Sequence, residues 1–218
     1  MKLLKKISIL GMLVSGSAMA ADYSASITPA GINLYAITAN GVELVAGSPY
    51  VLPQPGAPYP LTPAILAISP QHDFLYVVYE QLPYHGDLSQ DVKVVGLQIT
   101  AQGLVNQWSV GMNMDPAEYK FISLNATLQN VIVFTRPNGL FAAIFNEAGT
   151  NLFGDGSHGG DQLLSGRVAP DSGFYYSCRK SVAATPYVNV YLLGTTASPS
   201  PSLLLTSYDP DFMQSVCN

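Results

Sequence analysis

The sequence predicts an all-β fold built from many short antiparallel strands. Charged residues make up only 11% of the 218-residue chain and hydrophobic residues 48%. This balance excludes a disordered or coiled-coil protein, because both classes need many charges. The chain has 19 Gly, 16 Pro and 13 Tyr, a composition typical of strands joined by turns. Pro, Gly and alternating patterns interrupt every candidate helix after residue 20, so we expect no helix there.

A repeated hairpin motif predicts how the strands are grouped. A hydrophobic stretch that ends at Pro70 is followed by a polar turn and a second stretch that begins at Phe74. The same scheme returns at Pro170 and Phe174, and a looser copy occupies residues 116–134. Repeats at a spacing of roughly 50 residues favour propeller blades over a single sandwich.

Two further strands follow each hairpin, so each repeat predicts one blade, a sheet of four antiparallel strands. In the looser copy we expect the hairpin turn near Asn125. Two strands that precede the first repeat would belong to another blade, whose missing inner strand could come from residues 212–216. That pairing would close the ring and remove exposed sheet edges. The sequence thus predicts about four blades, with an incomplete or dimer-completed ring as the alternative. The strands expected outside the hairpins are residues 32–37, 42–45, 92–100, 104–110, 140–146, 150–153, 188–193 and 203–207.

One stretch carries a family resemblance. Asn-Gly-Val-Glu-Leu at residues 40–44 is followed by Gly-Ser-Pro-Tyr at 47–50 and by a Ser-Pro-turn-Phe-Leu-Tyr-Val hairpin at 69–77. Over residues 32–78 this order resembles the lactonase-type β-propeller family, also known for its tyrosine-valine repeats. The resemblance implies a propeller fold. It does not imply lactonase activity, because a seven-bladed member is much longer and no position here matches the catalytic residues of the family.

The N-terminal segment predicts export. Three lysines within the first six residues precede an apolar run at residues 7–14, and a small-x-small site ends at Ala20. The apolar run is too short to span a bilayer. We therefore expect a signal peptide at residues 1–20, cleaved after Ala20, and a single domain at residues 21–218 in the periplasm or outside the cell.

Removal of the signal peptide makes the chain strongly acidic. The signal peptide contains three of the nine basic residues. The rest of the chain therefore has six basic and 14 acidic residues, which gives a net charge of −8. A phosphate backbone needs a clustered basic surface, so nucleic acid is excluded as a partner. Anionic lipid surfaces are excluded by the same charge, and we expect no stable membrane anchor. The expected partner is an unidentified protein or small molecule.

Cys178 and Cys217 are the only cysteines. In an oxidising compartment a disulfide between them is one interpretation, and two buried thiols are the other. No C-x-x-C pattern is present, which excludes a thioredoxin-type redox motif.

A Gly-rich loop from Asp155 to Asp161 is a candidate calcium site, because Ca²⁺ prefers carboxylate and carbonyl oxygens. The loop lacks the EF-hand pattern, and an ordinary Gly-rich connection is the favoured interpretation. His72, His85 and His158 do not show the spacing of zinc ligands, so we expect them in solvent-exposed turns and loops. No metal or other cofactor is predicted.

No catalytic set can be assigned from the sequence. There is no G-x-S-x-G motif, although a propeller active site would draw isolated polar residues from several blades. Polar candidates near the expected strand ends, for which turn and cap roles are favoured, are Asp73, Glu80, Glu118, Arg136, Arg167 and Asp171. The aromatic residues expected to pack between blades are Tyr76, Tyr79, Phe134, Tyr175 and Tyr176.

These observations predict a non-catalytic exported domain that binds a protein or a small ligand through its loops or one face. The alternative is a reduced, lactonase-like hydrolase with its site in the central channel. A convergent cluster of Asp, Glu and His in that channel would favour the alternative.

Overall fold

The computed structural model describes most of the chain as four antiparallel sheets and one helix. It describes residues 22–54, 60–81, 92–111, 124–126, 132–134, 142–146, 148–156, 160–169, 173–193 and 201–217. Several predictions concern residues outside the described ranges, among them the signal peptide at 1–20, His85, His158, Glu118, Arg136 and Asp171.

The sheets follow one another along the chain, and each is a run of consecutive neighbouring strands. Sheet 1 contains β1 (Asp22–Thr28), β2 (Gly31–Thr38) and β3 (Gly41–Leu44). Sheet 2 contains β4 (Leu61–Ile68), β5 (Phe74–Gln81), β6 (Val92–Thr100) and β7 (Gly103–Gly111). Sheet 3 contains β8 (Leu124–Ala126), β9 (Ile132–Phe134), β10 (Ala142–Phe145) and β11 (Asn151–Asp155). Sheet 4 contains β12 (Gln162–Ala169), β13 (Phe174–Lys180), β14 (Pro186–Leu192) and β15 (Ser202–Ser207), and α1 (Pro210–Cys217) follows it.

This architecture confirms the propeller-like fold predicted from the repeats. Phe74 and Phe174 begin the second strand of sheets 2 and 4, and each pairs with the third strand of its sheet. The turn expected near Asn125 is wrong. Asn125 lies inside β8 opposite Val133 of β9, so β8 takes the place of the first strand in sheet 3.

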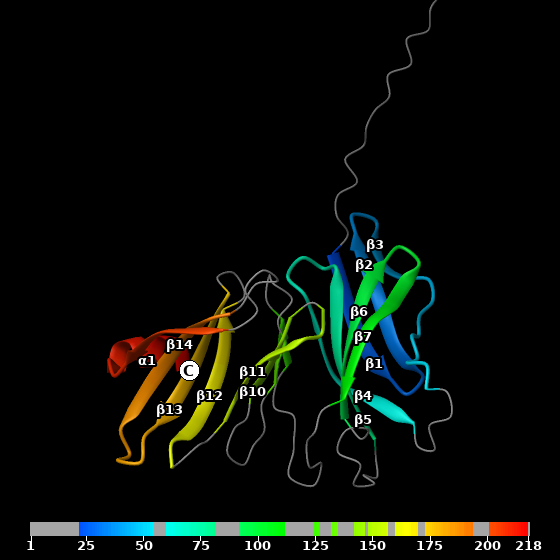
Figure 1. The fold of residues 1–218 in the computed structure, drawn as a ribbon. Helices are drawn as coiled ribbons and strands as arrows, with labels where there is room; N and C mark the ends of the chain where they lie inside the picture. Colours follow the sequence, from blue (N-terminus) through cyan, green and yellow to red (C-terminus); the bar gives the residue numbers. More distant parts are fainter. Residues whose placement is uncertain are drawn as a thin grey trace, which may run out of the picture.

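The sheets stack face to face in chain order, from sheet 1 on the right of Figure 1 to sheet 4 on the left. β5 shows how one strand serves two junctions. Its alternate residues Leu75, Val77 and Tyr79 pack towards sheet 1, while Tyr76 and Val78 pack towards sheet 3. Successive side chains of a strand point to opposite faces. A strand covered on both faces therefore reads as a continuous hydrophobic run, as β5 does.

The C-terminal residues form a helix, so two predictions are wrong: that no helix exists, and that residues 212–216 supply a strand to the first sheet. The Asp209 carboxylate accepts hydrogen bonds from the backbone N–H of Asp211 at 2.9 Å and of Phe212 at 3.2 Å. Pro210 occupies the first helical position, where its missing N–H costs nothing. The Asp209 cap and Pro210 together start a helix where the sequence analysis expected a strand.

Helix α1 covers the outer face of sheet 4. Its Phe212, Met213 and Val216 pack against Cys178 and Val188 of that sheet. A disulfide joins Cys178 to Cys217, whose Cα atoms lie 5.9 Å apart. In the described part of the chain, this helix is not long and apolar enough to cross a membrane.

Sheet 1 has three strands among the described residues, one fewer than a predicted blade, and none of them comes from the C-terminus. The strand that the prediction left open is β1, which begins at Asp22 and pairs along its whole length with β2. Sheet 1 and α1 lie at opposite ends of the array in Figure 1. The proposed exchange of strands between the two ends of the chain therefore does not occur among the described residues.

Candidate functional site

Both carboxylates of the candidate calcium loop have protein partners. Asp155 is buried in β11 and forms an ion pair with Arg179, with 2.6 Å between Oδ1 and Nη1. Asp161 accepts a hydrogen bond from the Tyr187 hydroxyl at 2.8 Å. Within the described ranges no three His, Cys, Asp or Glu side chains gather as a metal site would require. Residues 157–159 of the loop lie outside the described ranges, so the calcium site stays a prediction.

Asp155 is the centre of a joint between sheets 3 and 4. Tyr175, Ser177 and Arg179 alternate along β13, so their side chains share one face. All three hydrogen-bond to the Asp155 carboxylate, the Tyr175 hydroxyl at 3.0 Å, and Arg179 also donates to the carbonyl of Gly156 at 2.8 Å. Burial, followed by the nearby Asp155 charge, raises the pKa of Tyr175. A buried charge pair with its hydrogen bonds made is a structural element, because each partner compensates the desolvation of the other.

Of the polar residues considered for a channel site, the three that the structure describes, Asp73, Glu80 and Arg167, do not converge. Asp73 accepts a hydrogen bond from the Ser69 hydroxyl at 2.7 Å within the β4–β5 turn, and Glu80 lies at the other end of β5. The guanidinium of Arg167 donates to the carbonyl of Ser215 in α1 at 3.4 Å. Turn chemistry therefore accounts for Asp73, as the sequence favoured, whereas Arg167 lies inside β12 and contacts α1.

His72 was expected to be exposed to solvent, but it links sheets 1 and 2. Its Nδ1 atom accepts a hydrogen bond from the backbone N–H of Tyr23 at 3.1 Å and lies 3.5 Å from a carboxylate oxygen of Asp22. The side chain is about one-third exposed, at 34%. His72 therefore helps to hold the start of β1 against the β4–β5 turn.

A cleft of about 410 Å³ lies between sheet 4 and α1, beside the disulfide. Its wall includes Ser165, Arg179 and Tyr187. The Ser165 hydroxyl donates to the carbonyl of Cys217 at 3.4 Å, and the other two side chains bind Asp155 and Asp161. These three polar groups are therefore already engaged within the protein.

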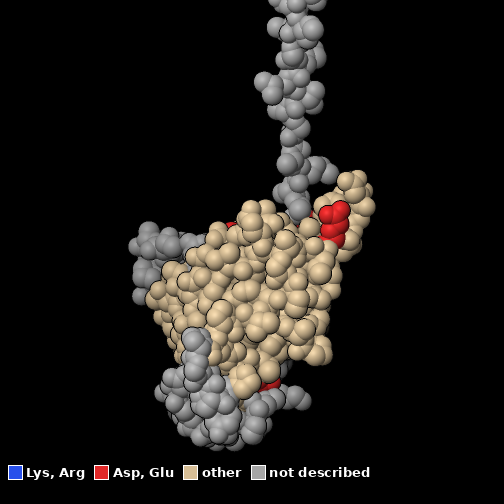
Figure 2. Space-filling model, turned by 90° about the vertical axis from the view of Figure 1, so that its right-hand side faces the viewer, with Lys and Arg blue, Asp and Glu red and all other residues tan. Residues whose placement is uncertain are grey.

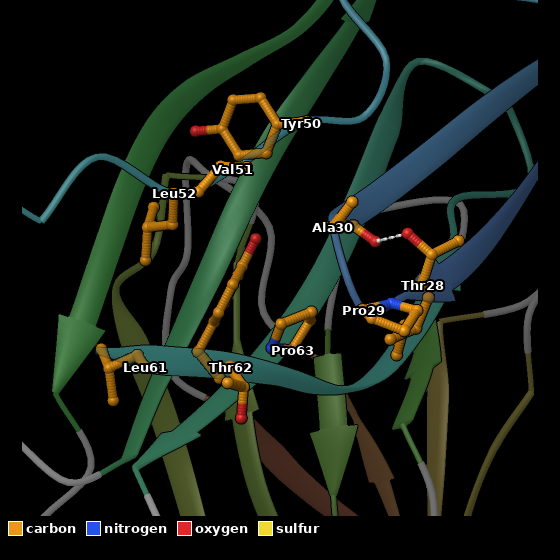
Figure 3. A pocket seen from close by; sticks show the side chains of 12 residues that line it. Thr28, Pro29, Ala30, Tyr50, Val51, Leu52, Leu61, Thr62 and Pro63 are labelled. Carbon is orange, nitrogen blue, oxygen red and sulfur yellow. Dashed lines mark hydrogen bonds between the residues drawn. The ribbon is translucent and has the colours of Figure 1, made fainter. Parts of the chain in front are cut away.

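A second pocket, of about 230 Å³, lies at one end of the junction between sheets 1 and 2. Figure 3 shows three short segments around it: the β1–β2 turn, the chain that follows β3, and the start of β4. Among the lining residues that the structure describes, none is charged. The lining residues are Ile27, Thr28, Pro29, Ala30, Gly31, Tyr50, Val51, Leu52, Leu61, Thr62, Pro63 and Tyr79.

The sequence motif Gly-Ser-Pro-Tyr at residues 47–50 positions Tyr50 in this wall. The Ser48 hydroxyl accepts a hydrogen bond from the Leu34 N–H at 3.1 Å, and Tyr50 exchanges two backbone hydrogen bonds with Ile32 at 2.7 and 2.9 Å. Gly31 has a φ of +132°, and a Cβ atom there would lie 2.4 Å from the carbonyl oxygen of Tyr50. Glycine is therefore required for residues 50–52 to lie against β2.

Two tyrosine hydroxyls distinguish this pocket from the cleft beside the disulfide. The hydroxyl oxygens of Tyr50 and Tyr79 are buried, and neither has a hydrogen-bond partner among the residues that the structure describes. Tyr79 as a whole is only 2% exposed. Burial raises the pKa of both phenols, and the nearby Tyr50 adds to the effect on Tyr79. Both phenols therefore keep their protons at neutral pH.

The sequence analysis missed this pocket but named some of its parts. Tyr79 was expected to pack between blades, as it does, and so were Tyr76 and Tyr175. Tyr176 instead packs against Phe212 of α1. Near Tyr50, Leu52 is buried and residues 61–63 begin β4. The Gly-Ser-Pro-Tyr motif was the available signal, because it fixes Tyr50 beside a buried strand.

Comparison with known proteins adds little to this description. No protein-family model and no curated protein matches the sequence. The fold is similar to the crystal structure of a protein from Lactobacillus plantarum, a structural-genomics target, with 15% identity and a TM-score of 0.45 over 84% of this chain. The chain spans 53% of the length of that protein. Similarity at this level carries no argument about function.

Proposed function

We propose that the protein is an exported, non-catalytic binding domain that holds a small molecule in the pocket between sheets 1 and 2. Export rests on the signal-peptide pattern of residues 1–20. Binding rests on one observation: a pocket of about 230 Å³ lies between sheets 1 and 2, and its described lining residues are mostly apolar.

An unpaired buried hydroxyl is costly, by about 1–3 kcal/mol, and folded proteins rarely retain one without a reason. Tyr50 and Tyr79 both carry such a group and both line the cavity, although the hydroxyl oxygens themselves are buried. Concave, mostly apolar pockets are the usual form of small-molecule sites.

The hydrolase alternative lacks comparable support. Among the described residues, Asp73 and Glu80 lie at opposite ends of β5, and Arg167 faces α1. The pocket itself contains no acid–base pair, because no carboxylate or histidine lines it. A binding role is therefore the better proposal for this chain.

The test is a thermal-shift screen of the exported form, residues 21–218, against neutral metabolites, sugar lactones and divalent metals. A ligand that binds only the folded state raises the melting temperature. The substitution Ala30→Trp fills the pocket, since Ala30 lies in its wall and at the surface. Ala101→Trp, in the exposed β6–β7 turn, is the matched control.

We expect a compound that stabilises the wild-type protein and the Ala101→Trp variant but not the Ala30→Trp variant. If stabilisation survived in both variants, the ligand would bind elsewhere and the pocket proposal would be wrong. A shift given only by a metal ion would contradict the proposal as well, because no metal-binding side chain lines the pocket.

A further inference from the structure

We infer that His72 is a pH-sensitive clasp, which holds the start of β1 against the β4–β5 turn when its ring is neutral and releases it when the ring is protonated. The inference concerns the junction of sheets 1 and 2 and does not depend on ligand binding in the pocket. It rests on two competing partners of one ring nitrogen, on the fixed turn that carries the ring, and on the charges around it.

The Nδ1 atom of His72 has two partners in β1 that need opposite protonation states. It accepts a hydrogen bond from the Tyr23 backbone N–H at 3.1 Å, and it lies 3.5 Å from a carboxylate oxygen of Asp22. A neutral imidazole has one nitrogen that accepts, whereas both nitrogens of the protonated ring donate. Nδ1 can therefore bind the Tyr23 N–H only without a proton, and the Asp22 carboxylate only with one.

The β4–β5 turn holds the ring beside β1. The Ser69 hydroxyl is buried in this turn and accepts hydrogen bonds from the backbone N–H of Asp73 at 3.2 Å and of Phe74 at 3.1 Å. The backbone N–H of His72 donates to the carbonyl of Ser69 at 2.9 Å. His72 has a φ of 60°, a left-handed conformation in which histidine is enriched. These bonds involve the backbone and Ser69 rather than the ring, so protonation changes the partner of the ring and leaves the turn in place.

The clasp acts on the edge of β1 that faces away from β2. Among the described residues β1 has a strand neighbour only on its β2 side, so the Tyr23 N–H finds its acceptor in a turn of sheet 2. The side chains of Tyr23 and Ala25 pack with the apolar residues between the two sheets. Loss of the Tyr23 hydrogen bond should therefore free the first residues of β1 without separating the sheets.

The described surroundings contain a carboxylate for the protonated ring and no basic side chain that would compete for it. Residues 22–54, 60–81 and 94–111 contain no Lys or Arg, and Figure 2, which views the molecule from the side of sheet 1, shows acidic side chains but no basic ones. The other carboxylate of the turn, on Asp73, accepts a hydrogen bond from the Ser69 hydroxyl at 2.7 Å. The α-amino group that export would leave at residue 21 stays charged below about pH 7. Asp22 is therefore the acceptor of the protonated ring.

The test is NMR of the isotope-labelled exported form between about pH 7 and about pH 5, where histidine side chains change charge. At the upper end, a coupling should be observed between the Tyr23 amide nitrogen and Nδ1 of His72, because two nitrogen nuclei couple across an N–H···N hydrogen bond. The coupling should disappear as the ring is protonated. The protection factor of the Tyr23 amide against hydrogen exchange should then fall about 5-fold, the effect of one modest hydrogen bond.

Three variants separate the clasp from general effects of pH. His72→Asn keeps a residue that tolerates the left-handed conformation and an oxygen that accepts at any pH, so the protection of Tyr23 should no longer respond to pH. Asp22→Asn removes the partner of the protonated ring, and the coupling to Tyr23 should persist to lower pH than in the wild type. Glu43→Gln, at an exposed carboxylate of β3, is the matched control and should leave the transition unchanged.

Two results would overturn the clasp: no coupling between Tyr23 and His72 at the upper pH, or a protection of the Tyr23 amide that does not follow protonation of the ring. Equal displacement of the transition in Asp22→Asn and Glu43→Gln would overturn the role of Asp22, because general charge and not this contact would then govern the exchange of partners.

Discussion

Strands β5 and β13 hold the same place in sheets 2 and 4, yet their equivalent faces differ in character. Towards sheet 1, β5 presents Leu75, Val77 and Tyr79. Towards sheet 3, β13 presents Tyr175, Ser177 and Arg179, which all bond to Asp155.

The comparison shows how a structural junction between two sheets differs from a candidate ligand-binding site. At the junction of sheets 3 and 4, the polar groups gathered around the Asp155 carboxylate are paired with one another, and the result holds two sheets together. At the junction of sheets 1 and 2, two hydroxyls are buried without a partner among the described residues, on tyrosines that line a cavity. Burial alone does not separate the two cases; hydrogen-bond pairing does.

The largest expected effect comes from breaking the paired junction. Replacing Asp155 by Ala leaves the Arg179 guanidinium buried without its counter-charge, which should reduce the free energy of unfolding by about 3–5 kcal/mol in urea denaturation. Asp161→Ala, which removes only the bond to Tyr187, should cost about 1 kcal/mol. Equal losses for the two variants would show that the Asp155 network is not a structural joint.

Removing the disulfide is expected to come next. Cys178 and Cys217 are 39 residues apart in the sequence, and cross-linking such a loop stabilises the folded state by about 2–4 kcal/mol. The variant with both cysteines replaced by Ala should therefore unfold at lower urea concentration. Dithiothreitol should produce the same shift in the wild-type protein and none in the variant. A variant as stable as the wild type would contradict a stabilising role for the link.

Two conservative substitutions test the comparison directly. Tyr175→Phe removes a hydrogen bond to a buried carboxylate and should cost about 1.5–3 kcal/mol. Tyr79→Phe removes a hydroxyl that has no partner in the described chain, so it should be neutral or slightly stabilising. Thermal unfolding of both variants checks the contrast. A loss in Tyr79→Phe as large as that in Tyr175→Phe would mean that the Tyr79 hydroxyl is paired.

The smallest effect concerns alkaline pH. Burial raises the pKa of Tyr79 in the folded protein, so above about pH 10 the unfolded chain releases a proton that the folded chain keeps. Stability should therefore be complete below pH 10 and decline as the pH rises towards the folded pKa. Tyr79→Phe should remove about 1 kcal/mol of the decline between pH 10 and 11. Parallel decline in both proteins, measured by urea denaturation at each pH, would argue against this assignment.

The sequence predicted more of the fold than of the candidate site. The repeat that sets Phe74 and Phe174 at equivalent positions predicted the order of strands in sheets 2 and 4, because hydrophobic period and turns are local signals. The start of α1 was also local, in Asp209 and Pro210, but the expectation of a closed ring led to a strand there. The pocket could not be predicted from the sequence, because Tyr50 and Tyr79 become neighbours only when sheet 1 packs on sheet 2.

Helix α1 gives the array a direction. Sheet 1 leaves its outer face uncovered by any described element of this chain, whereas sheet 4 is closed by a helix that a covalent bond secures. A head-to-tail stack of copies would therefore place α1, not a sheet face, against the next copy. Contact between two uncovered faces would be self-complementary and would stop at a pair.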